Sequence, residues 1–362
     1  MNDLYAVIFA GGVGSRLWPV SRVGNPKQVK PFLGSNDTLI QRTWQRVRRL
    51  LPAESIYMST TADYAEMIAE QLPELSLANL IVEPELRNTC PAIGLATGII
   101  NKRHPGALVM NVWSDHHFGI EDAYTDTVCK SYNIIKKHPD QIMSVGAHIE
   151  YPSTALGYLE AEMSSVDEDG AVRVKRFVEK PDMVKAVEFM QAGNYFWNPA
   201  LFMWRADHML ALYQQHVPET YQGLIEVIGA WDTAEQDTVL RRIYPGLTKV
   251  SLEYAVLEKG PSMLLLPARL GWRDIGSWQS VHEVMEENGE GVATKGKALT
   301  IGSKDVLVFN EDDGKLVTVV GLEDVAVINT PDAVLVIKKS RDQDVKKLVE
   351  KMEKEEKLRQ YL

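Results

Sequence analysis

A glycine-rich turn followed by two cations is the part of this sequence with the clearest chemistry. The apolar segment Leu4–Ala10 predicts a strand, which leads directly into a glycine-rich turn ending at Arg16. Glycines allow positive φ angles and close approach of the backbone to a ligand, and successive N–H groups can surround phosphate oxygens. Arg16 adds a fixed positive charge, and Lys27 adds a second after Pro26. These residues together predict a polyphosphate-binding loop made of Gly11, Gly12, Gly14 and Ser15, with Arg16 and Lys27 as its cations.

Two common phosphate-binding motifs are not found at this turn. A Walker A loop needs G-x-x-x-x-G-K-[ST], and no such run occurs. A dinucleotide fingerprint needs G-x-G-x-x-G, and Gly12-Val13-Gly14 begins it, but Leu17 occupies the position of the third glycine. The turn therefore predicts a different kind of nucleotide site.

Two aspartates stand where a metal ion would be useful. Asp115 follows the strand-like segment Ala107–Val112, and ligands bind at the carboxyl ends of parallel strands in open α/β sheets. Asp274 lies in the aromatic-flanked segment Trp272–Trp278. Two carboxylates, completed by phosphates and water, suit Mg²⁺. Taken alone, either aspartate is more typical of a helix cap or a surface position than of a metal site.

Composition excludes several classes of protein. The chain has 362 residues, 45% hydrophobic and 24% charged, with a formal net charge of −10, so nucleic acid is not an expected partner. Its two cysteines, Cys90 and Cys129, are too few for a disulfide framework, which favours a reducing, cytoplasmic location. No apolar stretch is long enough for a membrane span, and the N-terminus does not resemble a signal peptide.

The order of apolar and helical segments predicts an α/β fold with a second, smaller part. Strand and helix patterns alternate through residues 1–287, which we expect to form one catalytic domain. Residues 288–362 form the expected second domain, rich in Val and Ile with regularly spaced turns, and typical of a small coiled β-structure. The segment Asp342–Leu362 predicts an amphipathic helix with Val345, Leu348, Met352 and Leu358 on one side. Either a packing or dimer contact or a solvated terminal helix is consistent with that pattern.

The motifs of this chain resemble, in family order, those of the sugar-nucleotidyltransferases. The glycine turn and the later Pro-Lys match the family signature G-G-x-G-x-R-L-x-P…P-K, in the form typical of the mannose-1-phosphate guanylyltransferase branch. The resemblance implies a Rossmann-like α/β nucleotidyltransferase domain with a mixed, mostly parallel sheet. It also implies a short, left-handed β-helix-like C-terminal domain with a terminal helix.

Site roles follow from the same resemblance, position by position. Asp115 and Asp274 correspond to the family's metal-binding aspartates, although Trp113-Ser114 replaces the usual Pro-Ala before Asp115. The catalytic cations implied are Arg16, Lys27 and Lys180, the last within Phe177-Val178-Glu179-Lys180-Pro181. Contacts to the sugar phosphate are implied for Gly157, Glu179, Lys180 and Asn198, where Pro199-Ala200 departs from the usual small residue and glycine. Nucleotide contacts are implied for Glu83, Arg87 and Asn88, because a carboxylate can accept from the guanine donors N1–H and N2–H₂.

The resemblance implies a Mg²⁺-dependent transfer of GMP from GTP to mannose 1-phosphate, with a homodimer expected. Another sugar 1-phosphate, such as a manno-heptose or fucose phosphate, is the alternative acceptor, and a non-catalytic regulatory paralogue is the alternative class. A phosphoesterase reading of Asp115-His116-His117 lacks the further early aspartates that such chemistry needs. The isomerase domain fused to some members is not expected here, because the sequence ends too soon after the β-rich part.

Overall fold

The computed structural model describes residues 1–34, 36–286 and 291–362, and these pack into two compact units. Unit 1 contains Met1–Gly11, Thr43–Ser114 and Phe118–Trp272; unit 2 contains Gly12–Arg42, Asp115–His117 and Arg273–Leu362. The boundary predicted between residues 287 and 288 lies outside the described residues. Packing thus groups the glycine-rich turn and Asp115 with the C-terminal part of the chain.

Unit 1 is built on a mixed sheet of ten strands in the order β11-β8-β7-β9-β6-β10-β4-β1-β2-β3. Parallel pairing joins β3, β2, β1 and β4, and also β6 and β11, while β7 to β10 pair antiparallel with their neighbours. The expected mixed sheet is confirmed. Its strands are β1 (Leu4–Phe9), β2 (Ile56–Thr61), β3 (Leu80–Glu83), β4 (Leu108–Trp113), β6 (Ile142–Ala147), β7 (Gly157–Glu162), β8 (Val172–Glu179), β9 (Tyr195–Trp197), β10 (Phe202–Arg205) and β11 (Met263–Ala268).

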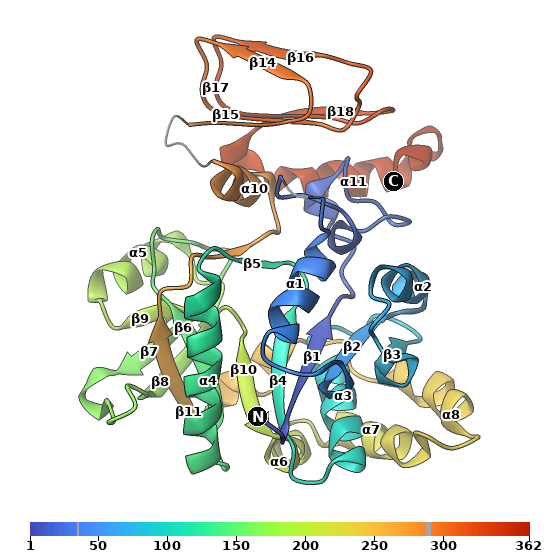
Figure 1. The fold of residues 1–362 in the computed structure, drawn as a ribbon, viewed down its shortest axis with the longest axis vertical. Helices are drawn as coiled ribbons and strands as arrows, with labels where there is room; N and C mark the ends of the chain where they lie inside the picture. The colour runs from blue at the N-terminus through green and yellow to red at the C-terminus, as the bar shows by residue number, and fades with distance from the viewer. Residues whose placement is uncertain (35, 287–290) are drawn as a thin grey trace. The chain divides into compact units, whose positions relative to one another are not determined.

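Helices cover both faces of this sheet, because its central strands are apolar on both sides. Figure 1 shows α4 on one face and α3, α6 and α7 together on the other. Thr38 caps α1 by accepting from the backbone N–H of Gln41, and the Gln41 side chain accepts from the Thr38 N–H in return. The α-helices are α1 (Leu39–Arg48, begun in unit 2), α2 (Ala62–Gln71), α3 (Thr89–Arg103), α4 (Glu121–Lys137), α5 (Met183–Ala192), α6 (Ala206–His216), α7 (Pro218–Ala230), α8 (Gln236–Ile243) and α9 (Leu252–Ala255).

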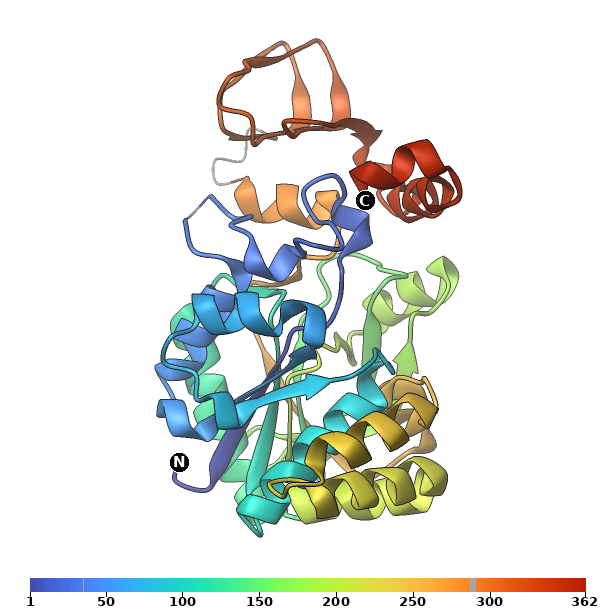
Figure 2. The same cartoon turned by 90° about the vertical axis from the view of Figure 1, so that its right-hand side faces the viewer.

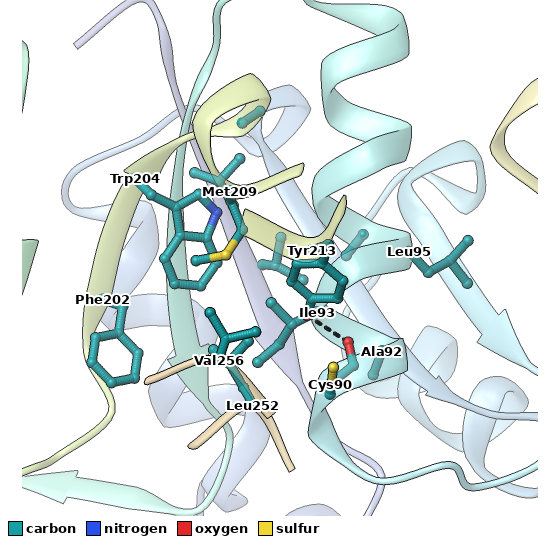
Figure 3. Close-up of a cluster of buried hydrophobic side chains, with 14 of the residues drawn as sticks. Cys90, Ala92, Ile93, Leu95, Phe202, Trp204, Met209, Tyr213, Leu252 and Val256 are labelled. Carbon is teal, nitrogen blue, oxygen red and sulfur yellow. Dashed lines mark hydrogen bonds between the residues drawn. The ribbon is translucent and has the colours of Figure 1, made fainter. Parts of the chain in front are cut away.

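A large apolar core fixes the N-terminal end of α3. Figure 3 shows α3 side chains against Phe202 and Trp204 of β10 and Leu252 of α9. The hydroxyl of Tyr213 in α6 donates to the Cys90 carbonyl at 2.6 Å, within this core. Burial raises the pKa of the Cys90 thiol to about 12, so Cys90 serves packing. The loop that precedes α3 therefore starts from a rigid base.

Unit 2 contains the glycine-rich turn, the residues around Asp115 and the C-terminal β-structure. Its strands β13, β15 and β17 pair in parallel, as do β14 and β16, and Figure 2 shows these strands as two facing layers. Val306, Val308, Val319 and Val327 form a buried cluster between the two sheets. The predicted β-rich domain is confirmed. Its elements are η1 (Ser15–Leu17), η2 (Lys27–Val29), β5 (His116–Phe118, ending in unit 1), β12 (Trp272–Asp274, begun in unit 1), α10 (Trp278–Met285), β13 (Val292–Lys295), β14 (Ala298–Ile301), β15 (Lys304–Asn310), β16 (Val317–Val320), β17 (Glu323–Asn329), β18 (Val334–Lys338), η8 (Lys339–Arg341), α11 (Asp344–Lys354) and η9 (Glu356–Tyr361).

The terminal helix packs within unit 2 and is not a solvated arm. Val345, Val349 and Met352 are buried in one apolar core with Leu17 and Trp18. The expectation for Leu348 was wrong, since it is 37% exposed and Val349 takes the buried position. The α-helix ends at Lys354 and a 3₁₀ turn follows, so Leu358 does not lie on the same helical face as Val345 and Met352. Among the described residues, no helix is both long and apolar enough to cross a membrane.

Candidate active site

The glycine-rich turn in unit 2 has the backbone that its sequence predicts. Gly14 lies at φ 72° and ψ 40°, a left-handed conformation that favours glycine. A Cβ atom at this position would lie 2.9 Å from Cγ and Cδ of Lys27. Gly14 therefore permits both the turn itself and the passage of the Lys27 side chain beneath it.

Lys27 is buried and holds two acceptors at once. Its ammonium lies 2.6 Å from Asp115 Oδ2 and donates to the Ile275 carbonyl at 2.8 Å, and its side chain is 8% exposed. Burial would raise the pKa of Asp115, but the Lys27 charge, His116 and hydrogen bonds outweigh it and lower that pKa to about 2. Asp115 is therefore a carboxylate at neutral pH, as a metal ligand must be.

Asp274 lies beside Asp115 and faces Arg16. Asp115 directly precedes β5, Asp274 ends β12, and these strands form a two-stranded sheet, with the Ile275 N–H donating to the Asp115 carbonyl at 3.0 Å. A Cβ atom at Gly276 would lie 2.9 Å from Arg16 Nη2 and 3.0 Å from Asp274 Oδ2. Gly276 thus leaves the space in which the guanidinium and the carboxylate approach one another.

This arrangement has a donor set that fits a divalent cation. Ligand atoms of Asp115, His116 and Asp274 all lie within 4.8 Å of one another. Two carboxylates leave most of the coordination sphere to water and substrate oxygens, which is the usual situation for Mg²⁺. The structure thus brings together the two predicted metal ligands, and it adds His116, which the motif analysis did not assign.

The predicted sugar-phosphate residues lie together in unit 1. Lys180 follows β8 at φ 47°, and its ammonium donates to Glu179 Oε1 at 2.6 Å. Burial would lower the Lys180 pKa, but the Glu179 carboxylate outweighs it and raises that pKa. Gly157 pairs with Glu179 across β7 and β8, and a Cβ on Gly157 would lie 2.6 Å from Glu179 Oε2. Gly157 therefore makes room for the carboxylate that holds Lys180.

Asn198 connects to the same group through the backbone. Its N–H donates to the Gly157 carbonyl at 2.8 Å, and its Oδ1 accepts from the Ala200 N–H at 2.9 Å. Ala200 has φ 49°, so this chain places an alanine in a conformation that favours the glycine of the family motif. The departure noted in the sequence therefore falls on a strained turn beside the sugar-phosphate residues.

The loop Glu83–Asn88 has one buried end and one strained end. Glu83 is 3% exposed, and its carboxylate accepts from Ser59 at 3.1 Å and from Tyr244 at 2.6 Å. Asn88 has φ 67° and ψ −175°, a region almost restricted to glycine, while its side chain caps α3 at the Thr89 N–H. This geometry does not support direct recognition of a base by Glu83, which anchors the loop from below. Arg87 and Asn88 lie at the partly exposed end.

Glu253 interacts with both groups of unit 1 residues, although the sequence predicted it only as part of a site-lining segment. Its carboxylate accepts from the Thr89 hydroxyl at 3.4 Å, next to Asn88, and burial raises its pKa, with Glu179 contributing in the same direction. The sequence signal was the segment Ser251–Lys259, which resembles a family segment that has aspartate at this position.

The fold and these residues define a class of protein that binds a nucleotide and transfers part of it. The chain belongs to the nucleotidyl transferase family, whose model matches residues 5–290. A second model, for the MannoseP isomerase/GMP-like beta-helix domain, matches residues 296–352. The family resemblance and the enzyme class predicted from the motifs are thereby confirmed.

Individual relatives are similar over nearly the whole chain. Mannose-1-phosphate guanylyltransferase 2 of Escherichia coli O157:H7 is 34% identical over 363 residues, covering 97% of this chain and 74% of that protein. The alginate biosynthesis protein AlgA of Pseudomonas aeruginosa is 33% identical, covering 96% and 72%. A crystal structure from Thermus thermophilus, described as a mannose-1-phosphate geranyltransferase, superimposes with a TM-score of 0.86 at 26% identity, covering 97% of this chain and 99% of that one.

Proposed function

We propose that this chain transfers GMP from GTP to mannose 1-phosphate, giving GDP-mannose and pyrophosphate. The observation that carries the proposal is the arrangement in unit 2. There the side chains of Lys27 and Arg16 and the carboxylates of Asp115 and Asp274 lie close to the glycine-rich turn. Similar relatives named mannose-1-phosphate guanylyltransferase support the choice of sugar and nucleotide.

The reaction needs cations more than it needs a base. One oxygen of the mannose 1-phosphate attacks the α-phosphorus of GTP, and the bond from that phosphorus to the α–β bridging oxygen breaks, releasing pyrophosphate. The attacking monoester has a second pKa near 6, so it is already ionised at neutral pH. The barrier comes from bringing two anions together and from the charge that accumulates on the leaving group, so positioning and electrostatic stabilisation supply the catalysis.

Residues of unit 2 are proposed to bind the triphosphate of the nucleotide. Within the described residues, the backbone N–H groups from Gly12 to Ser15 donate to no protein acceptor, so they remain for phosphate oxygens. Arg16 and Lys27 are the proposed triphosphate cations. Asp115 and Asp274 would hold Mg²⁺, which when bound neutralises charge on the phosphate oxygens. Lys27 is proposed to contact the phosphates from its position beside Asp115.

Residues of unit 1 are proposed to bind the sugar 1-phosphate acceptor and the guanine of the nucleotide. Lys180 is proposed to contact the phosphate of the sugar, with Glu179 and Asn198 at the hydroxyls and Gly157 providing space. Arg87 and Asn88 are proposed to contact the guanine nucleotide, and Glu83 positions their loop through Tyr244 and Ser59.

One experiment tests the proposal directly. The purified protein is incubated with GTP, MgCl₂ and a panel of sugar 1-phosphates, and pyrophosphate release and product mass are measured. GDP-mannose formation from mannose 1-phosphate is expected to be the fastest reaction, and GTP is expected to exceed ATP and UTP as donor. Absence of any pyrophosphate release across the panel would instead favour a non-catalytic nucleotide-sugar binding protein.

The panel should include a manno-heptose 1-phosphate and a fucose 1-phosphate because of the backbone at Ala200. Ala200 holds a left-handed φ beside Asn198, where the family motif has glycine, so the sugar loop of this chain differs at its turn. Faster turnover of a manno-heptose or fucose 1-phosphate would transfer the proposal to that sugar and leave the reaction unchanged.

A further inference from the structure

The C-terminal end of the chain is attached to the glycine-rich turn. Trp18 directly follows η1, and its indole N–H donates to the Tyr361 carbonyl at 2.7 Å. The Trp18 carbonyl accepts from the Trp278 indole at 3.0 Å, in the helix that begins shortly after Asp274. Trp18 is thus held from two sides, by the last turn of the chain and by α10.

Apolar packing supports these hydrogen bonds. Leu17 and Trp18 share one buried core with Val345, Val349 and Met352 of α11, and Tyr361 packs against its edge. Burial of such apolar side chains stabilises the contact between these segments. The residues that directly follow the glycine-rich turn are therefore packed against α11 and η9.

One side chain of this C-terminal segment reaches a proposed catalytic cation. Gln343, immediately before α11, accepts from Arg16 Nη1 through its Oε1 at 3.3 Å. Its amide nitrogen donates to Asp342 Oδ1 at 3.0 Å, which directs the oxygen of the amide toward Arg16. Arg16 Nη2 remains on the side of Gly276 and Asp274.

We propose that Gln343, held by α11 and η9, is a positioning residue that orients Arg16 toward the triphosphate of the nucleotide. The C-terminal segment is then part of the nucleotide-binding machinery, in addition to completing the β-structure. This inference rests on the proposed function for the identity of the nucleotide. The attachment of Trp18 to the C-terminal segment through Tyr361, called the link below, does not depend on that function.

Steady-state kinetics of Gln343 variants test the positioning role. Gln343→Ala removes the acceptor and is expected to raise the KM for GTP about fivefold, with the KM for mannose 1-phosphate and the melting temperature unchanged. Gln343→Glu is expected to raise the KM for GTP further, because a carboxylate both retains Arg16 and repels the triphosphate. Lys346→Ala, on the exposed side of α11 beside Glu350, is the matched control and should behave as the wild type.

The kinetic outcomes separate positioning from packing. Equal KM increases for both substrates, a lower melting temperature with an unchanged KM for GTP, or a Gln343→Glu variant equal to the wild type would each overturn the proposal.

Hydrogen exchange tests the link without any turnover. Trp18→Phe keeps an aromatic ring but loses the N–H that donates to the Tyr361 carbonyl. The backbone amides that close the turns after Gly14 should then exchange about tenfold faster than in the wild type. These are the amides of residues 17, 18, 20 and 21. Tyr361→Phe keeps the accepting carbonyl and should leave that exchange unchanged.

If the wild type releases no pyrophosphate from GTP and mannose 1-phosphate, the proposed function fails while faster exchange still supports the link. Unchanged exchange in Trp18→Phe would overturn the link whatever the activity.

Discussion

The ammonium of Lys27 lies 2.6 Å from the carboxylate of Asp115, so a proposed phosphate-binding cation and a proposed metal ligand neutralise one another within unit 2. The pair is mostly shielded from water, and Lys27 also satisfies the Ile275 carbonyl. Ion pairs in such surroundings stabilise a fold weakly, but removal of one partner is costly because the other charge remains. Lys27 thus has a structural role that must be separated from its catalytic one.

We expect Lys27→Met to lower both turnover and stability. The substitution keeps the volume of the side chain but leaves the Asp115 carboxylate without its cation, which should cost about 2–3 kcal/mol in the free energy of unfolding. Turnover should fall at least about 100-fold, because a preorganised charge at the phosphates is lost. Chemical denaturation and pyrophosphate release measure the two effects. Lys304→Met is the control, because Lys304 lies 3.9 Å from Glu323 with both side chains exposed and should change stability by less than about 1 kcal/mol.

Asp115→Asn and Asp274→Asn should each reduce turnover by orders of magnitude, since an amide is a poor Mg²⁺ ligand. Their effects on stability should differ. Asp115→Asn also weakens the Lys27 pair and should lower the melting temperature, whereas Asp274→Asn should leave it nearly unchanged. Excess chelator should abolish wild-type activity, and added Mg²⁺ should restore it. Near-normal turnover in either variant would remove that aspartate from the proposed metal site.

Gly276→Ala should reduce activity without unfolding the protein. The new Cβ would meet the far end of Arg16 at 2.9 Å and the Asp274 carboxylate at about the same distance, and both side chains can move at small cost. We expect a roughly tenfold or greater loss of kcat/KM for GTP, because Arg16 and Asp274 are displaced from each other. Gly246→Ala is the matched control, since a Cβ there meets nothing within 4 Å. Equal kinetics in the two variants would show that the space at Gly276 is unimportant.

The features that could be predicted from the sequence are those that are encoded locally. Gly14 could be predicted because a tight turn needs its φ angle, and Asp115 because it follows a buried strand at the ligand-binding edge of a sheet. The motif order also predicted the family, and apolar runs predicted strands β1 and β4 of unit 1.

The features that the sequence did not reveal depend on partners far away in the chain. Glu83 is withdrawn from the surface by Tyr244, 161 residues later, and nothing near Glu83 indicates that hydrogen bond. The association of Gly12–Arg42 with the C-terminal residues, which brings Gln343 to Arg16, likewise depends on tertiary packing. Leu348 and Val349 are adjacent apolar residues, so periodicity alone could not decide which one is buried.

Lys180→Ala should raise the KM for mannose 1-phosphate far more than the KM for GTP. Lys180 is held at the end of β8 by Glu179, whose carboxylate fits into the space left by Gly157, so its charge is fixed in place. Loss of a charge-assisted contact with a phosphate corresponds to roughly 10- to 100-fold. Lys185→Ala, on the exposed side of the following helix, should leave both constants unchanged. An equal effect of Lys180→Ala on both substrates would argue against a sugar-phosphate role.

Glu83 should make the stability of the protein depend on pH near neutrality. Burial raises the pKa of its carboxyl from 4.5 to about 7, although the Tyr244 and Ser59 hydroxyls act in the opposite direction. Between these values the folded protein keeps a proton that the unfolded chain has lost, so the contribution of Glu83 to stability is greatest below pH 4.5 and falls as the pH rises through 7. The total decrease should be about 3 kcal/mol. Glu83→Gln keeps the volume and cannot ionise, so its free energy of unfolding, measured in urea from about pH 5 to 8, should fall less steeply than that of the wild type. Identical slopes for the two proteins would show that Glu83 is ionised in the folded state throughout this range.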